Sequence, residues 1–267
     1  MDRRRLAVGG RIVPYWELAG SGAGTERTIV FLQGLFRRPT DYRPFLEDLA
    51  RRTGGARIVA PFLFGNGGLT RPPRSLDACA ELARETLEAL EIGGAGRSYE
   101  LVGHSTGGTM ALALASRAPP PRRVVAINPI LPTSFGAAGF VPRALRIAAK
   151  QLSGSAGPWK CGLFVALCTT SLCALNAISR PDAHAALVRS IAGFRWQDLG
   201  RAREVPVQLL LGAGDEFFTP PPRLQETLRD GPLPTALVTP VPGVNSHEWL
   251  LLEPERAAER VSSASAG

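Results

Sequence analysis

A serine flanked by glycines constrains the fold of this chain more than any other feature. The segment 103–108 reads Gly-His-Ser-Thr-Gly-Gly, and it lies between a β-rich run, Tyr99–Val102, and a small-residue run, Thr106–Ser116, that predicts a helix. A strand that turns directly into a helix requires a strained backbone at the turn. Side chains at positions 103 and 107 would collide with neighbouring backbone, so glycine is needed at both. The pattern predicts that Ser105 projects above the end of a sheet.

Strand and helix patterns alternate around this segment, which is typical of a parallel sheet covered by helices on both faces. The predicted strands are 28–32, 57–60, 99–102, 122–128, 206–211 and 235–239, and the predicted helices of this part are 41–52, 75–90, 106–116 and 254–261. Asp41 is a candidate N-cap for the first of these helices. We therefore predict an α/β fold with a mostly parallel central sheet flanked by helices.

The alternation stops between residues 132 and 203, where the sequence predicts helices at 142–152, 160–178 and 182–192 and no clear strand. We predict a core of residues 1–131 and 204–267 and a helical insertion of residues 132–203. Within the insertion, 161–179 carries no charge and approaches the ~20 residues of a membrane span. It also contains several hydroxyl side chains and Asn176. We favour a buried or substrate-facing helix, and membrane contact through 161–179 is the alternative.

The basic side chains of this chain are dispersed. The 267 residues include 31 basic and 23 acidic side chains, a net charge of +8, and all the basic residues except Lys150 and Lys160 are arginines. The triple at 3–5 is the longest basic run. Nucleic-acid binding requires basic residues gathered in one stripe with interleaved aromatic side chains. We therefore expect no nucleic-acid partner.

The cysteines and the N-terminal segment bear on cofactors and location. Cys79, Cys161, Cys168 and Cys173 lack CxxC spacing, which predicts neither a zinc site nor a disulfide framework. The apolar run after the arginine triple is too short for a secretory signal. We expect a cytoplasmic protein with reduced thiols and with neither a metal nor an organic cofactor.

A serine hydroxyl becomes a strong nucleophile only when a base takes its proton. The chain contains three histidines, His104, His184 and His247. His104 adjoins Ser105 on a sharp turn that points the two side chains apart, so we expect it to pack at the turn. His184 lies in an insertion helix, where a surface or pocket role is expected. His247 follows strand 235–239 in a polar loop and is the predicted base.

The predicted base needs a carboxylate that fixes its tautomer and stabilises the imidazolium. Asp215 lies in the loop after strand 206–211, and active sites of open α/β sheets collect at the C-terminal ends of strands. Asp215 is therefore the predicted acid, with Glu216 as the reserve. A simple capping role of Asp215 for the segment that follows is the alternative.

Acyl transfer also needs an oxyanion hole. One predicted donor is the backbone N–H of Thr106, directly after the nucleophile. The second is expected from the loop after strand 28–32, where the Leu35 N–H is the best candidate and Gly34 lets the backbone turn. The alternative for Gly34 is an ordinary turn at the end of a strand.

The whole chain resembles the α/β-hydrolase superfamily, in its capped branch of esterase- and lipase-like serine hydrolases. The resemblance rests on four segments, at 33–36 (QGLF), 103–108 (GHSTGG), 209–220 (LLLGAGDEFFTP) and 244–249 (VNSHEW). The order Ser105, Asp215, His247 is the family's order. The family more often has His-Gly where this chain has Gln33 and Gly34, so the effect of Gln33 on the oxyanion loop stays open. The resemblance also implies that residues 132–203 form a cap over the site.

The resemblance implies cleavage of a carboxylic ester through an acyl-enzyme on Ser105. The apolar side chains of the insertion favour a small-molecule substrate with an apolar acyl or alcohol moiety. Thioester, lactone or carbon–carbon hydrolysis, or a lyase or cyclase step, are alternatives on the same triad. A ligand-binding protein without turnover is a further alternative. Neither the substrate nor the oligomeric state is indicated by the sequence.

Overall fold

The computed structural model describes residues 1–20, 27–35, 37–64, 69–94, 97–117, 119–131, 181–195, 204–215, 224–231, 233–244 and 246–263. Its strands are β1 (Asp2–Val8), β2 (Arg11–Leu18), β3 (Thr28–Leu32), β4 (Arg57–Pro61), β5 (Tyr99–His104), β6 (Arg123–Ile127), β7 (Val207–Gly212) and β8 (Ala236–Val241). Its helices are the 3-10 helix η1 (Pro39–Tyr42) and α1 (Arg43–Arg52), α2 (Leu76–Ala89), α3 (Thr106–Ala115), α6 (Pro181–Ala192), α7 (Leu224–Arg229), α8 (Trp249–Leu252) and α9 (Pro254–Ser263). The helices predicted at 142–152 and 160–178 lie outside the described residues.

The strands form one sheet in the order β1-β2-β4-β3-β5-β6-β7-β8. Every neighbouring pair from β4 to β8 is parallel, and only the pairs β1–β2 and β2–β4 are antiparallel. The predicted α/β fold with a mostly parallel sheet is therefore confirmed. Because β3, β5, β6 and β7 run in the same direction, their C-terminal ends meet at one edge of the sheet.

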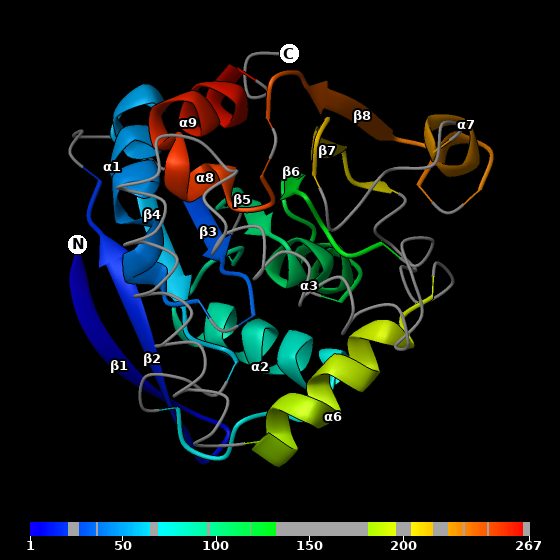
Figure 1. Ribbon diagram of the computed structural model, residues 1–267. Coiled ribbons are helices and arrows are strands. Elements are labelled where there is room, and N and C mark those ends of the chain that lie inside the picture. The colour runs from blue at the N-terminus through cyan, green and yellow to red at the C-terminus, as the bar shows by residue number, and fades with distance from the viewer. Residues whose placement is uncertain are drawn as a thin grey trace.

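Helices cover both faces of the sheet (Figure 1), and each face has its own apolar core. On one face, α2, α3, α6 and α7 contribute to a cluster with the sheet. On the other face, α1, α8 and α9 enclose a second cluster, which includes the fully buried Phe31, Tyr42 and Trp249. The strand at the centre, β5, is buried along its whole length because both faces are covered.

The two N-terminal strands were not predicted from the sequence. The arginine triple at 3–5 lies in β1, at the edge of the sheet, with its side chains exposed. A charged edge strand opposes pairing with another sheet. Arg4 also forms an ion pair with Glu17 of β2 at 2.9 Å. Because an edge strand with a solvated face has few apolar residues, its sequence lacks the pattern by which the central strands were predicted.

The start of α1 differs from the prediction. Asp41 lies in η1, where its Oδ2 accepts a hydrogen bond from the Arg38 N–H at 2.9 Å. Tyr42 is the N-cap residue of α1, and its side chain does not cap the helix by a hydrogen bond. Pro44 in the first turn of α1 provides the fixed φ that suits a helix start. Asp41 therefore stabilises the turn that leads into the helix rather than the helix itself.

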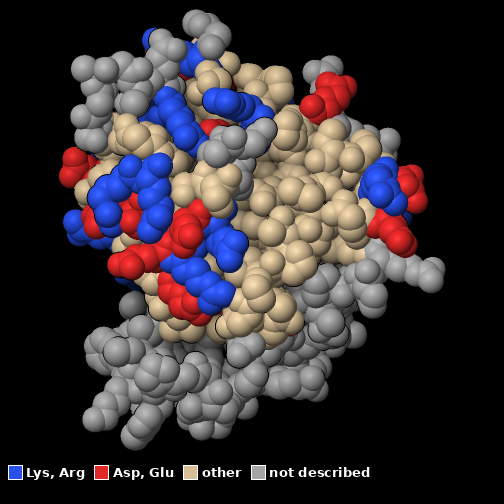
Figure 2. Space-filling model, turned by 90° about the horizontal axis from the view of Figure 1, so that it is seen from above, with Lys and Arg blue, Asp and Glu red and all other residues tan. Residues whose placement is uncertain are grey.

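The charges on the surface are mixed. In the view of Figure 2, Lys and Arg side chains lie among Asp and Glu rather than in one basic patch. Two of the surface ion pairs are Arg43–Glu47 at 2.7 Å and Arg51–Asp48 at 2.6 Å. Within the part of the chain that the structure describes, no helix is long and apolar enough to cross a membrane, and residues 161–179 lie outside that part.

Candidate active site

Ser105 occupies a strained turn between β5 and α3. Its backbone angles are φ 55° and ψ −123°, a left-handed conformation that non-glycine residues seldom adopt. A Cβ on Gly103 would collide with the backbone of Gly107, and a Cβ on Gly107 would collide with the carbonyl groups at the end of β3. Both glycines are therefore required by close backbone approach. This is the turn that the segment 103–108 predicted.

The Ser105 side chain does not cap the helix that it precedes. Serine at an N-cap usually accepts a hydrogen bond from the first turn of its helix. Ser105 makes no such side-chain bond, and its carbonyl instead accepts from the Gly108 N–H at 2.9 Å. The positive end of the α3 dipole lies next to the hydroxyl, where it favours negative charge.

His247 and Asp215 are hydrogen bonded to each other. Asp215 follows β7 and His247 precedes α8, and the distance from His247 Nδ1 to Asp215 Oδ2 is 2.9 Å. Both side chains are buried, with 5% and 1% of their surface exposed. Because the carboxylate accepts the proton of Nδ1, the neutral ring has its lone pair on Nε2. This is the tautomer in which a histidine can take a proton from a serine.

The electrostatic surroundings of His247 favour its protonated form. Burial lowers the pKa of His247, but the charge and the hydrogen bond of Asp215 more than offset burial, so that the pKa lies above its ordinary value near 6.5. The neighbouring Glu248 contributes in the same direction. Burial raises the pKa of Glu248, yet Arg37 at 3.1 Å and the two nearby histidines lower it to about 2. Glu248 is therefore ionised at neutral pH.

Neither of the other two histidines is hydrogen bonded to Asp215 among the described contacts. His104 is fully buried, and its ring centroid is 5.1 Å from that of His247. Burial lowers the pKa of His104 to about 4, so its ring is neutral at neutral pH. The backbone of His184 lies in α6, and its side chain is outside the described residues. Glu216, the reserve acid, is outside them as well.

The loop after β3 brings Leu35 next to α3. The Leu35 N–H donates to Thr106 Oγ1 at 2.6 Å, and the Gly34 N–H donates to Tyr42 Oη at 3.2 Å. Leu35 and Thr106 are therefore brought together, but the N–H predicted for the oxyanion already has an acceptor. Gln33 is fully buried, and its side-chain Oε1 and Nε2 have no hydrogen-bond partner among the described residues.

Sequence reasoning missed three side chains at this site: Tyr42, Asn128 and Arg37. Tyr42 Oη lies 2.9 Å from His104 Nδ1, and Asn128 Nδ2 donates to the His247 carbonyl at 3.3 Å. Asn128 has φ 44°, so it shares the left-handed backbone of Ser105. A polar residue directly after a β-rich run was the available signal for Asn128. Tyr42 had no such signal, because it resembles a core residue of the helix.

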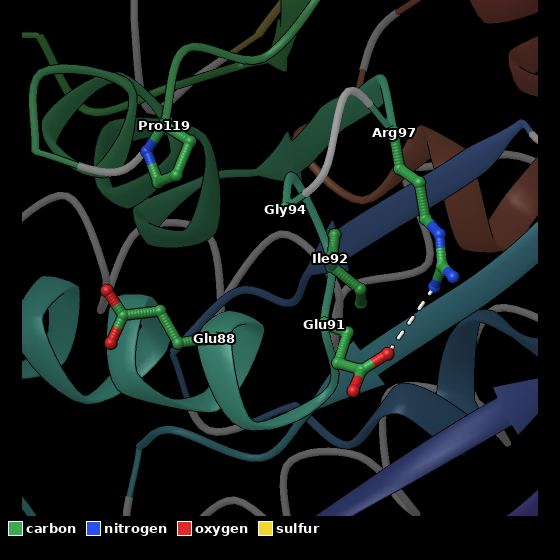
Figure 3. Close-up of a pocket in the computed structure, with 6 residues that line it drawn as sticks. All are labelled: Glu88, Glu91, Ile92, Gly94, Arg97 and Pro119. Carbon is green, nitrogen blue, oxygen red and sulfur yellow. Dashed lines mark ion pairs between the residues drawn. The ribbon is translucent and has the colours of Figure 1, made fainter.

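A pocket of about 370 Å³ lies at the opposite end of β5, between α2 and the segment that leads into the strand (Figure 3). Ser105 follows the other end of β5, roughly 20 Å away for a strand of this length. The pocket is lined by Glu88, Glu91, Ile92, Gly94, Arg97 and Pro119. Its ion pair between Glu91 and Arg97 is exposed to solvent. This pocket is therefore not part of the candidate active site.

Comparisons with known proteins agree with the fold of the chain. A family model described as alpha/beta hydrolase family matches residues 29–260. No curated protein sequence matches the chain significantly.

Solved structures share the fold over nearly the full length. An enol-lactonase from Burkholderia xenovorans LB400 is 17% identical, with a TM-score of 0.72 over 99% of this chain and 100% of that one. A hydrolase from Pseudomonas aeruginosa PA01 is 20% identical, with a TM-score of 0.70 over 98% and 97% of the two chains. A thermophilic esterase from Thermogutta terrifontis is 16% identical, with a TM-score of 0.68 over 100% and 98%.

Proposed function

Because the chain belongs to the alpha/beta hydrolase family, we propose that it is a serine hydrolase that cleaves a carboxylic ester. In this proposal Ser105 is the nucleophile, His247 the general base and Asp215 the residue that orients the base. The observation that carries it is the buried 2.9 Å hydrogen bond between His247 and Asp215, on loops at the same edge of the sheet as the strained serine. An ester substrate is further supported by the occurrence of an esterase and an enol-lactonase among the similar structures.

The proposed reaction proceeds in two acyl transfers. The Ser105 hydroxyl transfers its proton to His247 Nε2 while its oxygen forms a bond to the ester carbonyl carbon. The tetrahedral intermediate collapses, the bond to the alcohol oxygen breaks, and the imidazolium gives its proton to the leaving alcohol. Water then attacks the acyl-enzyme with the same base, which releases the carboxylic acid and restores the serine. Asp215 stabilises the imidazolium in both steps and keeps its own negative charge.

The oxyanion is proposed to be held by the backbone N–H groups of Thr106 and Leu35. The Leu35 N–H donates to Thr106 Oγ1 in the free protein, so it must exchange that acceptor for the oxyanion or share itself between the two. An exchange of this kind is favourable because a full negative charge is a stronger acceptor than a hydroxyl.

The substrate, partners and location remain proposals. We propose a small-molecule substrate with an apolar moiety, and a cap formed by residues 132–203, of which the structure describes 181–195. Lactones, thioesters and carbon–carbon bonds are the competing substrates of the same machinery. We propose a cytoplasmic protein without a nucleic-acid partner or cofactor.

The proposal predicts that Ser105→Ala abolishes turnover without unfolding the protein. With p-nitrophenyl esters of increasing acyl length as substrates, kcat of Ser105→Ala should be lower than that of the wild type by about 10⁴-fold or more. Ser116→Ala is a matched control on the same helix, since its Oγ donates only to the Ala113 carbonyl at the helix end. A lactone and a thioester assayed in parallel identify the preferred bond. Turnover that survives Ser105→Ala while the wild type is active would contradict the role of Ser105.

The proposal also predicts the pH dependence of the reaction. Only neutral His247 can accept the serine proton, so kcat/KM should fall as the pH drops through the pKa of His247. The midpoint of this acid limb should lie above 6.5, because Asp215 raises that pKa. In Asp215→Asn the charge is lost and burial remains, so the ring should titrate below 6.5 in an NMR pH titration. An acid limb below 6.5 in the wild type, or an unchanged titration in Asp215→Asn, would contradict this assignment.

The oxyanion proposal predicts different effects for two substitutions of Thr106. Thr106→Val keeps the shape of the side chain but removes the acceptor that competes for the Leu35 N–H. If that N–H serves the oxyanion, kcat/KM should not fall in this variant, and it should also be retained in Thr106→Ser. A loss of about 100-fold in Thr106→Val that Thr106→Ser does not show would contradict the role of Leu35. The Thr106 hydroxyl itself would then be the second donor.

A further inference from the structure

We propose that Tyr42 and His104 are positioning residues that fasten the oxyanion loop to the backbone of His247. This inference rests on the proposed function, and it adds a role for two buried side chains that the triad and the oxyanion hole do not use. It is built on three consecutive hydrogen bonds, two of which join residues that are far apart in the sequence.

The three bonds begin in the loop after β3 and end at the candidate base. The Gly34 N–H donates to Tyr42 Oη at 3.2 Å, Tyr42 Oη lies 2.9 Å from His104 Nδ1, and His104 Nε2 lies 3.0 Å from the His247 carbonyl oxygen. Tyr42 and His104 are both fully buried. Phe31 packs against the Tyr42 ring at 4.8 Å between centroids, which holds the phenol in place.

We call these three consecutive hydrogen bonds the relay. The donor and acceptor properties of the groups determine which atom carries the proton in each bond. A carbonyl oxygen only accepts, so His104 must donate from Nε2 to His247. The neutral ring then has its lone pair on Nδ1, which must accept the single proton of the Tyr42 hydroxyl. The Tyr42 oxygen in turn accepts the Gly34 N–H. Each donor therefore meets an acceptor, and the assignment agrees with the low pKa of buried His104.

A second buried side chain holds the same carbonyl. Asn128 Nδ2 donates to the His247 carbonyl at 3.3 Å, and Asn128 Oδ1 accepts the Gly212 N–H at 2.8 Å. Gly212 ends β7 and lies three residues before Asp215. The loops that carry the proposed oxyanion donor, acid and base are thus all fastened to one carbonyl oxygen.

The relay also explains how the oxyanion loop is supported in this chain. Within the described part of the chain the Gln33 side chain makes no hydrogen bond, whereas Tyr42 Oη accepts the Gly34 N–H of the same loop. A Cβ on Gly34 would lie 3.2 Å from Tyr42 Oη and 3.4 Å from Ser105 Cβ, which shows how close the loop, the tyrosine and the nucleophile are. A displacement of about 1 Å at such a site can cost about 100-fold in rate.

Tyr42→Phe tests the inference, because it removes only the hydroxyl that joins Gly34 to His104. We expect kcat for p-nitrophenyl ester hydrolysis to fall about 10- to 100-fold with little change in KM. Tyr99→Phe is the matched control. The Tyr99 hydroxyl is also hydrogen bonded, to the Pro119 carbonyl at 2.7 Å, but it lies at the opposite end of β5 from Ser105. This control should lose thermal stability while it keeps kcat.

An NMR measurement tests the relay without turnover. The ¹⁵N-coupled imidazole spectrum of the wild type should show His104 as the neutral Nε2–H tautomer, and its Nδ1 resonance should shift in Tyr42→Phe. The Gly34 amide should exchange with solvent faster in that variant. The chain has only three histidines, which makes the assignment tractable.

The possible outcomes separate the two proposals. An active wild type whose kcat survives Tyr42→Phe, or falls equally in Tyr99→Phe, overturns the positioning role. A His104 ring that is protonated on Nδ1 in the wild type overturns it as well, even if Tyr42→Phe does not fold. A wild type that hydrolyses no ester overturns the proposed function, and the NMR results then still decide whether the relay exists.

Discussion

The structure of this protein depends on the close approach of two backbone segments at the end of β5. The turn around Ser105 brings Gly107 against the last carbonyl groups of β3, with no space for a Cβ at positions 103 or 107. That contact is possible only because β3 and β5 are parallel neighbours whose C-terminal ends coincide, with Leu32 opposite Gly103. The same contact that strains the serine therefore places it beside the loop that follows β3. A single packing constraint therefore brings the serine turn next to the segment proposed to hold the oxyanion.

Hydrogen bonds and charges then hold the other loops at this edge. The His247 carbonyl receives bonds from His104 and Asn128, while the His247 ring is held by Asp215. A buried polar group without a partner costs folding free energy. Movement of these loops would leave such groups unpaired, so the hydrogen bonds at the His247 carbonyl also rigidify the region. The ion pair of Arg37 and Glu248 adds a further link between the loop after β3 and the segment after His247. The site is consequently fixed by contacts between residues that are distant in the chain.

Local sequence patterns predict parts of this molecule, whereas contacts between distant residues cannot be read from such patterns. Three features have local signals in the sequence. The turn at Ser105 is marked by glycines at positions where a Cβ would collide with backbone, the central strands by β-rich runs, and α2 by an apolar face at helical spacing. The same reasoning selected Asp215 and His247, which the structure brings within hydrogen-bond distance. It missed β1, an exposed edge strand that carries the arginine triple, and β2, which lies between β1 and β4. It also proposed Asp41 as the N-cap of α1, whereas Asp41 lies in η1. It also missed Tyr42, because its partner His104 is 62 residues away and the sequence does not show that contact.

We propose that the strained turn presents Ser105 as the nucleophile of a triad. Treatment of the intact protein with a fluorophosphonate, followed by peptide mass spectrometry, tests this claim without knowledge of the substrate. We expect one phosphonyl adduct per chain, located on Ser105, that forms far more slowly in His247→Ala. An unmodified Ser105 in folded protein, or an adduct on another residue, would contradict the account.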